Sequence, residues 1–259
     1  MAVATSPRIR PVPVPALVLL LAAALAWIGT VVWIRGEHMG AAPGTMGMAP
    51  VTFVAMWALM MAAMMLPSVW PFASVYAKGV AAGSTGRLTG LAAGYTGAWA
   101  STGVIAFGLA WTFGRIAQDH QSLARGTAVA TFAVVGLYQL TPAKRRCLSH
   151  CRSPISHLLH YASFRGRFRD LRAGYSHGLF CLGCCWALMV MLVAFGVMNL
   201  AAMVGLAAII GIEKIWRHGD TFAKVVGVAA LAYAVALVFA PHLAPGLAPP
   251  TVAKPMGGM

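Results

Sequence analysis

Apolar runs of about twenty residues recur along the whole chain, and they restrict its fold more than any other feature. A helix needs about 20 apolar residues to cross the roughly 30 Å of hydrocarbon in a bilayer. Backbone polar groups in a bilayer must be satisfied within the protein, so runs of this length indicate helices. Of the 259 residues, 60% are hydrophobic and 9% are charged, whereas soluble domains carry about 25% charged residues. The sequence therefore predicts an all-α, polytopic transmembrane helix bundle.

The apolar runs predict about seven spans in a single integral membrane domain covering residues 1–259. Arg8 and Arg10 precede the first run, which continues to Ile34; this is long for a signal peptide and favours an uncleaved span. Small residues recur at every fourth position from Gly90 to Thr102, which predicts a close helix contact in the third span. The expected spans are 14–35, 51–77, 89–113, 124–142, 174–195, 197–213 and 221–241.

The distribution of Lys and Arg predicts the orientation of these spans, because cytoplasmic loops are enriched in positive charge. With seven spans, 15 of the 19 Lys and Arg residues fall on one side of the membrane and four on the other. The N-terminus is therefore expected inside, and the tail at 242–259 outside. The same distribution accounts for the net charge of +14. The expected partner is the lipid bilayer, and neither nucleic acid nor a nucleotide is expected.

The loop at 143–173 carries the largest share of the positive charge. Within it Ile155, Leu158 and Leu159 alternate with arginines, and Pro154 suits the first turn of a helix. The pattern predicts a basic amphipathic segment over 155–172 that rests on the cytoplasmic leaflet.

The strongest motif is His177-x3-Cys181-x2-Cys184-Cys185. Offsets of 0, 4, 7 and 8 fall on one face of a helix, here at the expected cytoplasmic start of the fifth span. Thiolate and imidazole ligands together suit Zn, Cu(I) or an iron–sulfur cluster. A single buried cysteine is often only a small hydrophobe. Three on one stripe with a histidine favour a metal site.

A second motif, Cys147-x2-His150-Cys151, follows the fourth span on the same side of the membrane. Its residues also share one helical face, and a structural zinc site needs about four such ligands. We therefore expect one site built from both motifs, with a sulfur of Cys147 or Cys151 within about 4 Å of a sulfur from the first motif. His157 and His160 are weaker candidates because loop histidines are common.

The chain contains 15 methionines, whose soft thioether sulfur selects Cu(I). In the second span Met56, Met60 and Met64 repeat at every fourth position, as a relay for metal or as ordinary packing. Further sulfur and imidazole ligands for an outward metal site lie in the first outward loop and the C-terminal tail: His38, Met39, Met46, Met48, Met256 and Met259.

Two features predict a polar region inside the bundle. Pro67 and Pro71 interrupt the second span and free backbone carbonyls that neighbouring groups must satisfy. Glu213 lies near the cytoplasmic end of the sixth span. It is expected either to pair with the adjacent Lys214 at the interface or to face the metal site.

Three stretches resemble the DUF2182 family of predicted metal-binding integral membrane proteins. They are MMAAMMLPS at 60–68, YQLTPAKRRCLSHCRSP at 138–154 and HGLFCLGCCWALM at 177–189, within a family-like core of about 55–215. The resemblance implies a multi-pass protein of the bacterial inner membrane that binds metal. The ligands it implies are Cys147, His150, Cys151, His177, Cys181, Cys184 and Cys185.

These features together favour a protein that binds and hands on a soft transition metal, rather than an enzyme. Copper is favoured over zinc or iron, and the role is delivery, homeostasis or assembly of a metalloenzyme, with a metal donor or acceptor protein as partner. One alternative is a membrane thiol-disulfide oxidoreductase that uses Cys181 and Cys184, because a helix N-terminus lowers the pKa of a thiol. Another is a non-catalytic membrane subunit with a structural metal.

Overall fold

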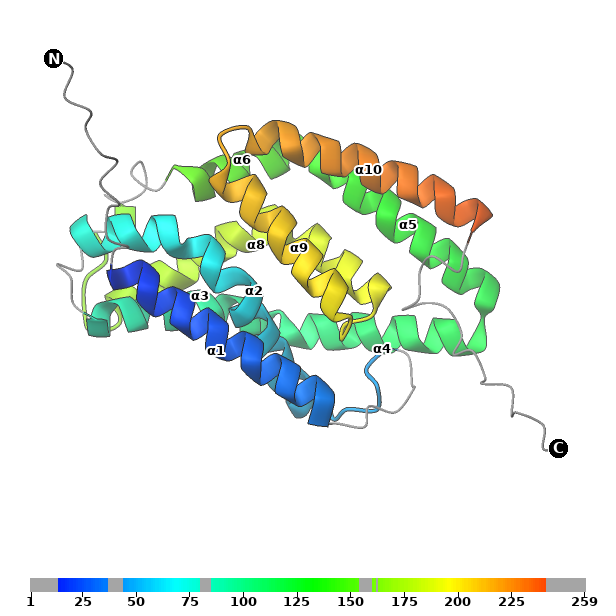
Figure 1. Cartoon of the computed structure of the whole chain (residues 1–259), viewed down its shortest axis with the longest axis horizontal. Coiled ribbons are helices and arrows are strands. Elements are labelled where there is room, and N and C mark those ends of the chain that lie inside the picture. The colour runs from blue at the N-terminus through cyan, green and yellow to red at the C-terminus, as the bar shows by residue number, and fades with distance from the viewer. Residues whose placement is uncertain (1–13, 37–43, 80–84, 154–159, 162, 241–259) are drawn as a thin grey trace, which may run out of the picture.

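The computed structural model describes residues 14–36, 44–79, 85–153, 160–161 and 163–240, which form helices joined by short turns. The helices are α1 (Val14–Gly36), α2 (Pro50–Gly79), α3 (Thr85–Ser101), α4 (Gly103–Asp119), α5 (Gln121–Leu140), α6 (Pro142–Arg152), α8 (Arg169–Phe195), α9 (Leu200–Ile215) and α10 (Gly219–Phe239). No strand occurs in the described ranges, so the all-α class is confirmed. In Figure 1, α9 lies in front of α8, between the α1–α2 pair and the α5–α10 pair.

Five helices, α1, α2, α5, α8 and α10, are long and apolar enough to cross a membrane. They coincide with five of the seven predicted spans. The predicted third span is divided between α3 and α4, which have 17 residues each. The predicted sixth span corresponds to α9, which has 16 residues. The count of seven spans and the orientation of the termini stay predictions.

The division between α3 and α4 falls at Thr102. Ser101 Oγ donates a hydrogen bond to the Ala98 carbonyl at 2.8 Å, and Thr102 Oγ1 donates one to the Trp99 carbonyl at 2.6 Å. Hydroxyl groups that bond to nearby carbonyls in this way compete with the regular helix. Trp57 Nε1 also donates to Thr102 Oγ1 at 3.1 Å, which fixes the turn against α2. The expectation of one helix over 89–113 was therefore wrong.

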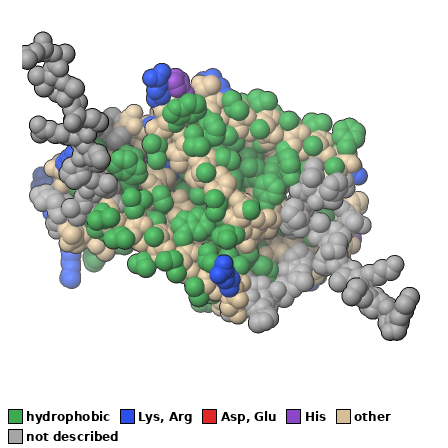
Figure 2. All heavy atoms as spheres, in the orientation of Figure 1, with side chains coloured by type: hydrophobic (Ala, Val, Ile, Leu, Met, Phe, Trp, Pro, Cys, Tyr) green, Lys and Arg blue, Asp and Glu red, His purple; other side chains and the backbone are tan. Residues whose placement is uncertain are grey.

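The outer surface of the bundle is largely apolar. Figure 2 shows hydrophobic side chains spread over most of the visible described surface, with Lys and Arg near its edges. Leu25, Val104, Leu137 and Val228 are among the large apolar side chains that are exposed. Soluble monomers rarely expose apolar patches of more than a few hundred Å². A surface of this kind fits contact with lipid.

The contact between α3 and α8 is close because glycines face each other across it. A Cβ atom on Gly94 would lie 2.0 Å from the Leu171 carbonyl oxygen, and one on Gly174 would lie 2.0 Å from the Leu91 carbonyl oxygen. The small residues predicted to form a helix contact in the third span therefore do so. This approach brings Tyr95 of α3 next to the cysteines of α8.

α5 and α10 lie side by side along their lengths (Figure 1). Small residues line their contact: a Cβ atom on Gly136 would lie 2.8 Å from the Gly227 carbonyl oxygen, and Ala128 and Ala234 are buried. This pair forms one wall of the bundle and packs against α8 and α9.

The predicted loop at 143–173 contains regular structure at both ends. Its first part forms α6, and its last residues belong to α8, which begins at Arg169 rather than at 174. Pro154, Ile155, Leu158 and Leu159 lie outside the described residues, so the surface segment predicted over 155–172 is untested there.

Candidate metal centre

Three cysteines of α8 form a compact buried group. Cys181, Cys184 and Cys185 are each at most 1% exposed, and their sulfur atoms all lie within 4.8 Å of one another. The Sγ atoms of Cys184 and Cys185 are 3.2 Å apart. The predicted helical stripe therefore exists, but it stands near the middle of the 27-residue α8 and not at its start. Because α8 extends back to Arg169, the motif does not lie at the N-terminus of the helix, and its place relative to the cytoplasmic face stays a prediction.

α6 brings the second cysteine motif to the first. Thr141 caps this helix by accepting a hydrogen bond from the Lys144 backbone N–H at 3.2 Å, and Pro142 occupies its first turn. The Sγ atom of Cys151 lies 3.9 Å from that of Cys184, so the expected approach within about 4 Å is found. We call Cys151, Cys181, Cys184 and Cys185 the thiol cluster. That they are metal ligands stays a prediction.

Cys147 takes a different place from Cys151, although both lie on α6. Its sulfur packs against the α8 backbone at Gly183, where a Cβ atom would lie 2.9 Å from it. The absent side chain at Gly183 thus allows α6 to approach α8. Tyr138, at the end of α5, donates a hydrogen bond to the Gly183 carbonyl. Cys147 lies beside the thiol cluster, and the compact three-sulfur group does not include it.

Lys214 of α9 points into the thiol cluster. Its Nζ atom donates hydrogen bonds to Cys181 Sγ and to Ser68 Oγ, each at 2.9 Å. The Tyr95 hydroxyl lies 2.9 Å from the same sulfur. Cys181 is therefore held by an ammonium group and a phenol from two other helices. This arrangement stabilises negative charge on the sulfur, because a charged donor makes a stronger hydrogen bond than a neutral one.

Glu213 pairs with Lys144 and not with its neighbour Lys214. Its carboxylate accepts hydrogen bonds from Lys144 Nζ and Gln139 Nε2, each at 2.7 Å, and both members of the ion pair are buried. Adjacent residues on a helix do not face each other, so Glu213 and Lys214 meet different neighbours. The predicted interfacial pair of these two residues was therefore wrong.

The Lys144–Glu213 pair also contacts the backbone of the thiol cluster. Lys144 Nζ donates to the Cys184 carbonyl at 2.5 Å. Burial acts to lower the pKa of Lys144, but Coulombic interactions with Cys185 and with the Glu213 carboxylate outweigh it, so this pKa lies above its usual value. Lys144 therefore stays charged and holds α6 against α8.

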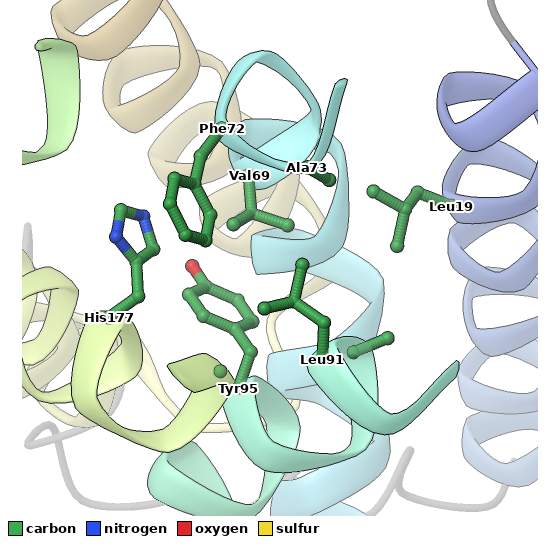
Figure 3. A pocket seen from close by; sticks show the side chains of 9 residues that line it. Leu19, Val69, Phe72, Ala73, Leu91, Tyr95 and His177 are labelled. Carbon is green, nitrogen blue, oxygen red and sulfur yellow. The ribbon is translucent and has the colours of Figure 1, made fainter. Parts of the chain in front are cut away.

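The two histidines of the motifs lie in an aromatic layer next to the thiols. The His177 ring stacks on Phe72 with centroids 3.9 Å apart, and the His150 ring stacks on Phe180 at 3.6 Å. The two imidazole centroids are 6.3 Å apart. Figure 3 shows His177 against Phe72, with the Tyr95 hydroxyl pointing toward this pair. His177 and His150 are thus close to each other. In sequence, His177 lies about one helical turn before Cys181, and His150 directly precedes Cys151.

Tyr161 closes this layer. Its hydroxyl lies 3.2 Å from His150 Nε2, and burial raises the pKa of Tyr161 to about 12. The phenol therefore stays protonated near neutral pH. His160 is exposed beside it, and His157 lies outside the described residues.

The methionines predicted to form a relay lie apart from those predicted to form an outward site. Met56, Met60 and Met64 are buried in α2. Met46 and Met48 are half-buried in the turn before α2, and this turn is about 27 Å along the helix from Ser68 at 1.5 Å per residue. The other methionines and the histidine expected in an outward site, His38, Met39, Met256 and Met259, lie outside the described residues.

Three contacts of the thiol cluster were missed by the sequence reasoning: those made by Tyr95, Lys144 and Lys214. Lys144 had been interpreted only as positive charge on the cytoplasmic side, and Lys214 only as such a charge or as a partner for Glu213. A signal was available for Lys214, because it adjoins an acidic residue within an apolar helix. Nothing in the local sequence indicates that Tyr95, 86 positions before Cys181, would contact it.

No match was found among curated proteins or among solved structures. The chain does match the model of the PpoB2 family, described as a copper chaperone, over residues 54–237. This match runs from near the start of α2 to near the end of α10 and so includes the thiol cluster, both buried lysines and the aromatic layer. The chain belongs to the PpoB2 family of copper chaperones.

Proposed function

We propose that this protein is a membrane-embedded copper chaperone that carries Cu(I) on the thiol cluster between α6 and α8. The observation that carries this proposal is the group of three buried sulfur atoms within 4.8 Å of one another, with a fourth sulfur 3.9 Å from Cys184. Soft thiolates select Cu(I). Zinc and iron are the other ions that such a group suits, and copper is preferred because of the family description.

Lys214 supports the choice of a monovalent ion with few ligands. Two thiolates and one Cu(I) carry a net charge of −1, which one ammonium group balances. Unbalanced charge is costly in a buried site, and Lys214 Nζ is already in contact with Cys181. The neighbouring Lys144 is balanced by Glu213 and adds no net charge.

The methionines of α2 support a route for the ion toward the thiol cluster. Met61, Met64 and Ser68 lie at spacings of three, four and seven residues and so share one side of α2. Ser68 hydrogen-bonds Lys214, which contacts Cys181. The predicted relay of Met56, Met60 and Met64 therefore runs along a helix that reaches the cluster. We propose that the turn with Met46 and Met48, and the outward residues His38 and Met39, provide its entrance.

The proposed location is the bacterial inner membrane, with seven spans, the N-terminus inside and residues 242–259 outside. The apolar outer surface and the bias of Lys and Arg support this topology. The resemblance to DUF2182 proteins supports the same location. A reporter fused after residue 259 should behave as extracytoplasmic, and a cytoplasmic signal would contradict the orientation.

The oxidoreductase alternative is less well supported by the geometry. It required Cys181 and Cys184 to lie at a helix N-terminus, because the helix dipole that lowers a thiol pKa acts only within about the first turn. Both residues instead stand near the middle of α8 and are buried. Thiol trapping in cells tests this alternative, since a reversible disulfide between these two residues would support it.

The decisive experiment measures metal on the full-length protein purified from its native membrane without added chelator. We expect copper to be the main bound metal and X-ray absorption at the copper edge to show sulfur ligands. Cys184→Ser should lower copper retention about tenfold or more, because a hydroxyl is a poor ligand for a soft ion.

Cys147→Ser is the matched control, because its sulfur packs against Gly183 on the same helix pair. This variant should keep most of the copper. Met46→Leu should keep it too and slow only loading from outside. Zinc in place of copper, or full copper content in Cys184→Ser, would contradict the proposal.

A further inference from the structure

α6 has a second face that the thiol cluster does not use. Lys144, Leu148 and Cys151 face the bundle, whereas Arg145 and Arg146 are exposed on the opposite side. These arginines form one wall of a depression of about 440 Å³ between α6 and the start of α10. We call it the basic depression; it is lined by Pro142, Arg145, Arg146, Ser149, Asp220 and Lys224.

The charge of the basic depression is strongly positive and unbalanced. Asp220, its single lining acid, is already paired with Arg152 at 3.2 Å. Among the described residues, no ion pair is formed by Arg145, Arg146 or Lys224. The first turn of α6 also lies here, and the N-terminus of a helix favours anions.

The walls of the depression are held in place by hydrogen bonds. Arg152, at the end of α6, donates to the carbonyl oxygens of Trp216 and Arg217 at 2.8 and 2.9 Å. The same side chain pairs with Asp220 of α10. On its inner side α6 is held by the buried pair of Lys144 and Glu213. The two helices that form the depression are therefore held in place relative to each other.

An exposed apolar strip adjoins the cations. Val228 lies one helical turn after Lys224, so both residues are on one face of α10, and both are exposed. Leu140 of α5 lies beside this strip, with Cδ2 3.2 Å from the position of a Cβ atom on Gly227, and its side chain is also partly exposed. A free phosphate ion would use only the cations, whereas a phospholipid would use the cations and the strip together.

We propose that the basic depression binds the phosphate headgroup of an anionic phospholipid, with the acyl chains along Val228 and Leu140. Basic pockets between transmembrane helices are a known way of holding such headgroups. The proposal rests on the membrane location proposed above and not on the bound metal. α6 therefore carries the headgroup cations on one face and Cys151 of the thiol cluster on the other.

The test is native mass spectrometry of the full-length protein released from detergent after incubation with phosphatidylglycerol or with phosphatidylcholine. We expect retained phosphatidylglycerol and little phosphatidylcholine. The triple variant Arg145→Gln, Arg146→Gln, Lys224→Gln should bind phosphatidylglycerol about a hundredfold more weakly, since each cation contributes to the attraction.

The control variant Arg35→Gln, Lys78→Gln, Arg125→Gln removes the same charge from exposed positions away from the depression, and it should bind as the wild type does. Equal loss in both variants, or equal retention of phosphatidylcholine, would overturn the proposal.

Competition with inorganic phosphate tests whether the ligand is a lipid headgroup or a free anion. Millimolar phosphate should not displace the phosphatidylglycerol; displacement would assign the depression to a free anion and overturn the lipid assignment. Circular dichroism of both variants checks that the helices are intact. Recovery of the wild type without detergent, in the soluble fraction, would instead refute the membrane location, which separates that failure from a failure of this proposal.

Discussion

The surroundings of the thiol cluster and the α5–α10 contact are built from different interactions. Around the cluster, Lys144, Glu213 and Lys214 are all buried and bonded to one another or to Cys181 and Cys184. Along the α5–α10 contact, small and apolar side chains meet, with Phe132 and Tyr233 rings 4.7 Å apart. The surroundings of the thiol cluster thus contain three buried charges. The α5–α10 contact shows that helices of this chain can pack together without buried charges.

The difference indicates what the buried charges are for. Ionisable groups inside a membrane are costly and are usually found where function needs them. A buried ion pair also rarely stabilises a protein more than apolar residues of similar size. Since the α5–α10 contact dispenses with such groups, we attribute those beside the thiol cluster to control of its charge and geometry.

The largest effect is expected from breaking the buried ion pair. Glu213→Gln should destabilise the protein by about 3–5 kcal/mol, because Lys144 is left as an uncompensated buried charge. Thermal unfolding in detergent measures this loss. The double variant Lys144→Met, Glu213→Leu should recover most of the stability. If the double variant is as unstable as the single one, the pair is not the source of the effect.

Two glycine variants should separate the two regions. Gly174→Ala and Gly136→Ala each place a methyl group against backbone of a facing helix, at 2.0 Å and 2.8 Å from a carbonyl oxygen. Both should lower stability by about 1–3 kcal/mol. Only Gly174→Ala should also lower copper retention, because α3 carries the Tyr95 hydroxyl that contacts Cys181.

Gly97→Ala is the control for both, since it lies on α3 with no atom near its Cβ position, and alanine there should be neutral or slightly stabilising. Unchanged copper retention in Gly174→Ala would show that the α3–α8 contact, like the α5–α10 contact, contributes only to stability.

The smallest change in stability, with a distinct change in binding, is expected for Lys214→Met. Replacing the buried ammonium with an apolar side chain should leave the unfolding temperature nearly unchanged, because the Cys181 sulfur can take up a proton and then carries no uncompensated charge. Copper retention should fall about tenfold, as expected for removal of a group that supports the ligands of a metal. Lys78→Met, at the exposed end of α2, is the matched control. A Lys214→Met protein that binds copper as tightly as the wild type would remove the ammonium from the proposed role.

The sequence predicted the parts of the site that depend on spacing along one helix. The stripe of Cys181, Cys184 and Cys185 follows from helical periodicity, and the small residues of the third span predicted a close helix contact, which is made with α8. The meeting of Cys151 with Cys184 followed from placing both motifs on one side of the membrane. These inferences succeed because they need only local geometry and topology.

The remaining features depend on which helices are neighbours, and periodicity does not give this. Lys214 and Glu213 are adjacent in sequence, yet one contacts α2 and α8 and the other contacts α5 and α6. The division of the third span had a local signal in Ser101 and Thr102, but the apolar run around them concealed it. Long-range packing also placed Tyr95 at the thiols.

Glu213 and Lys214 couple the position of α9 to two sets of buried contacts. Their side chains leave the helix about 100° apart and bond different neighbours, Glu213 at α5 and α6 and Lys214 at α2 and α8. A rotation or sliding of α9 would therefore disturb the contacts of both side chains at the same time. A movement of α9 would thus change the surroundings of the Cys181 sulfur together with the position of α6, which carries Cys151.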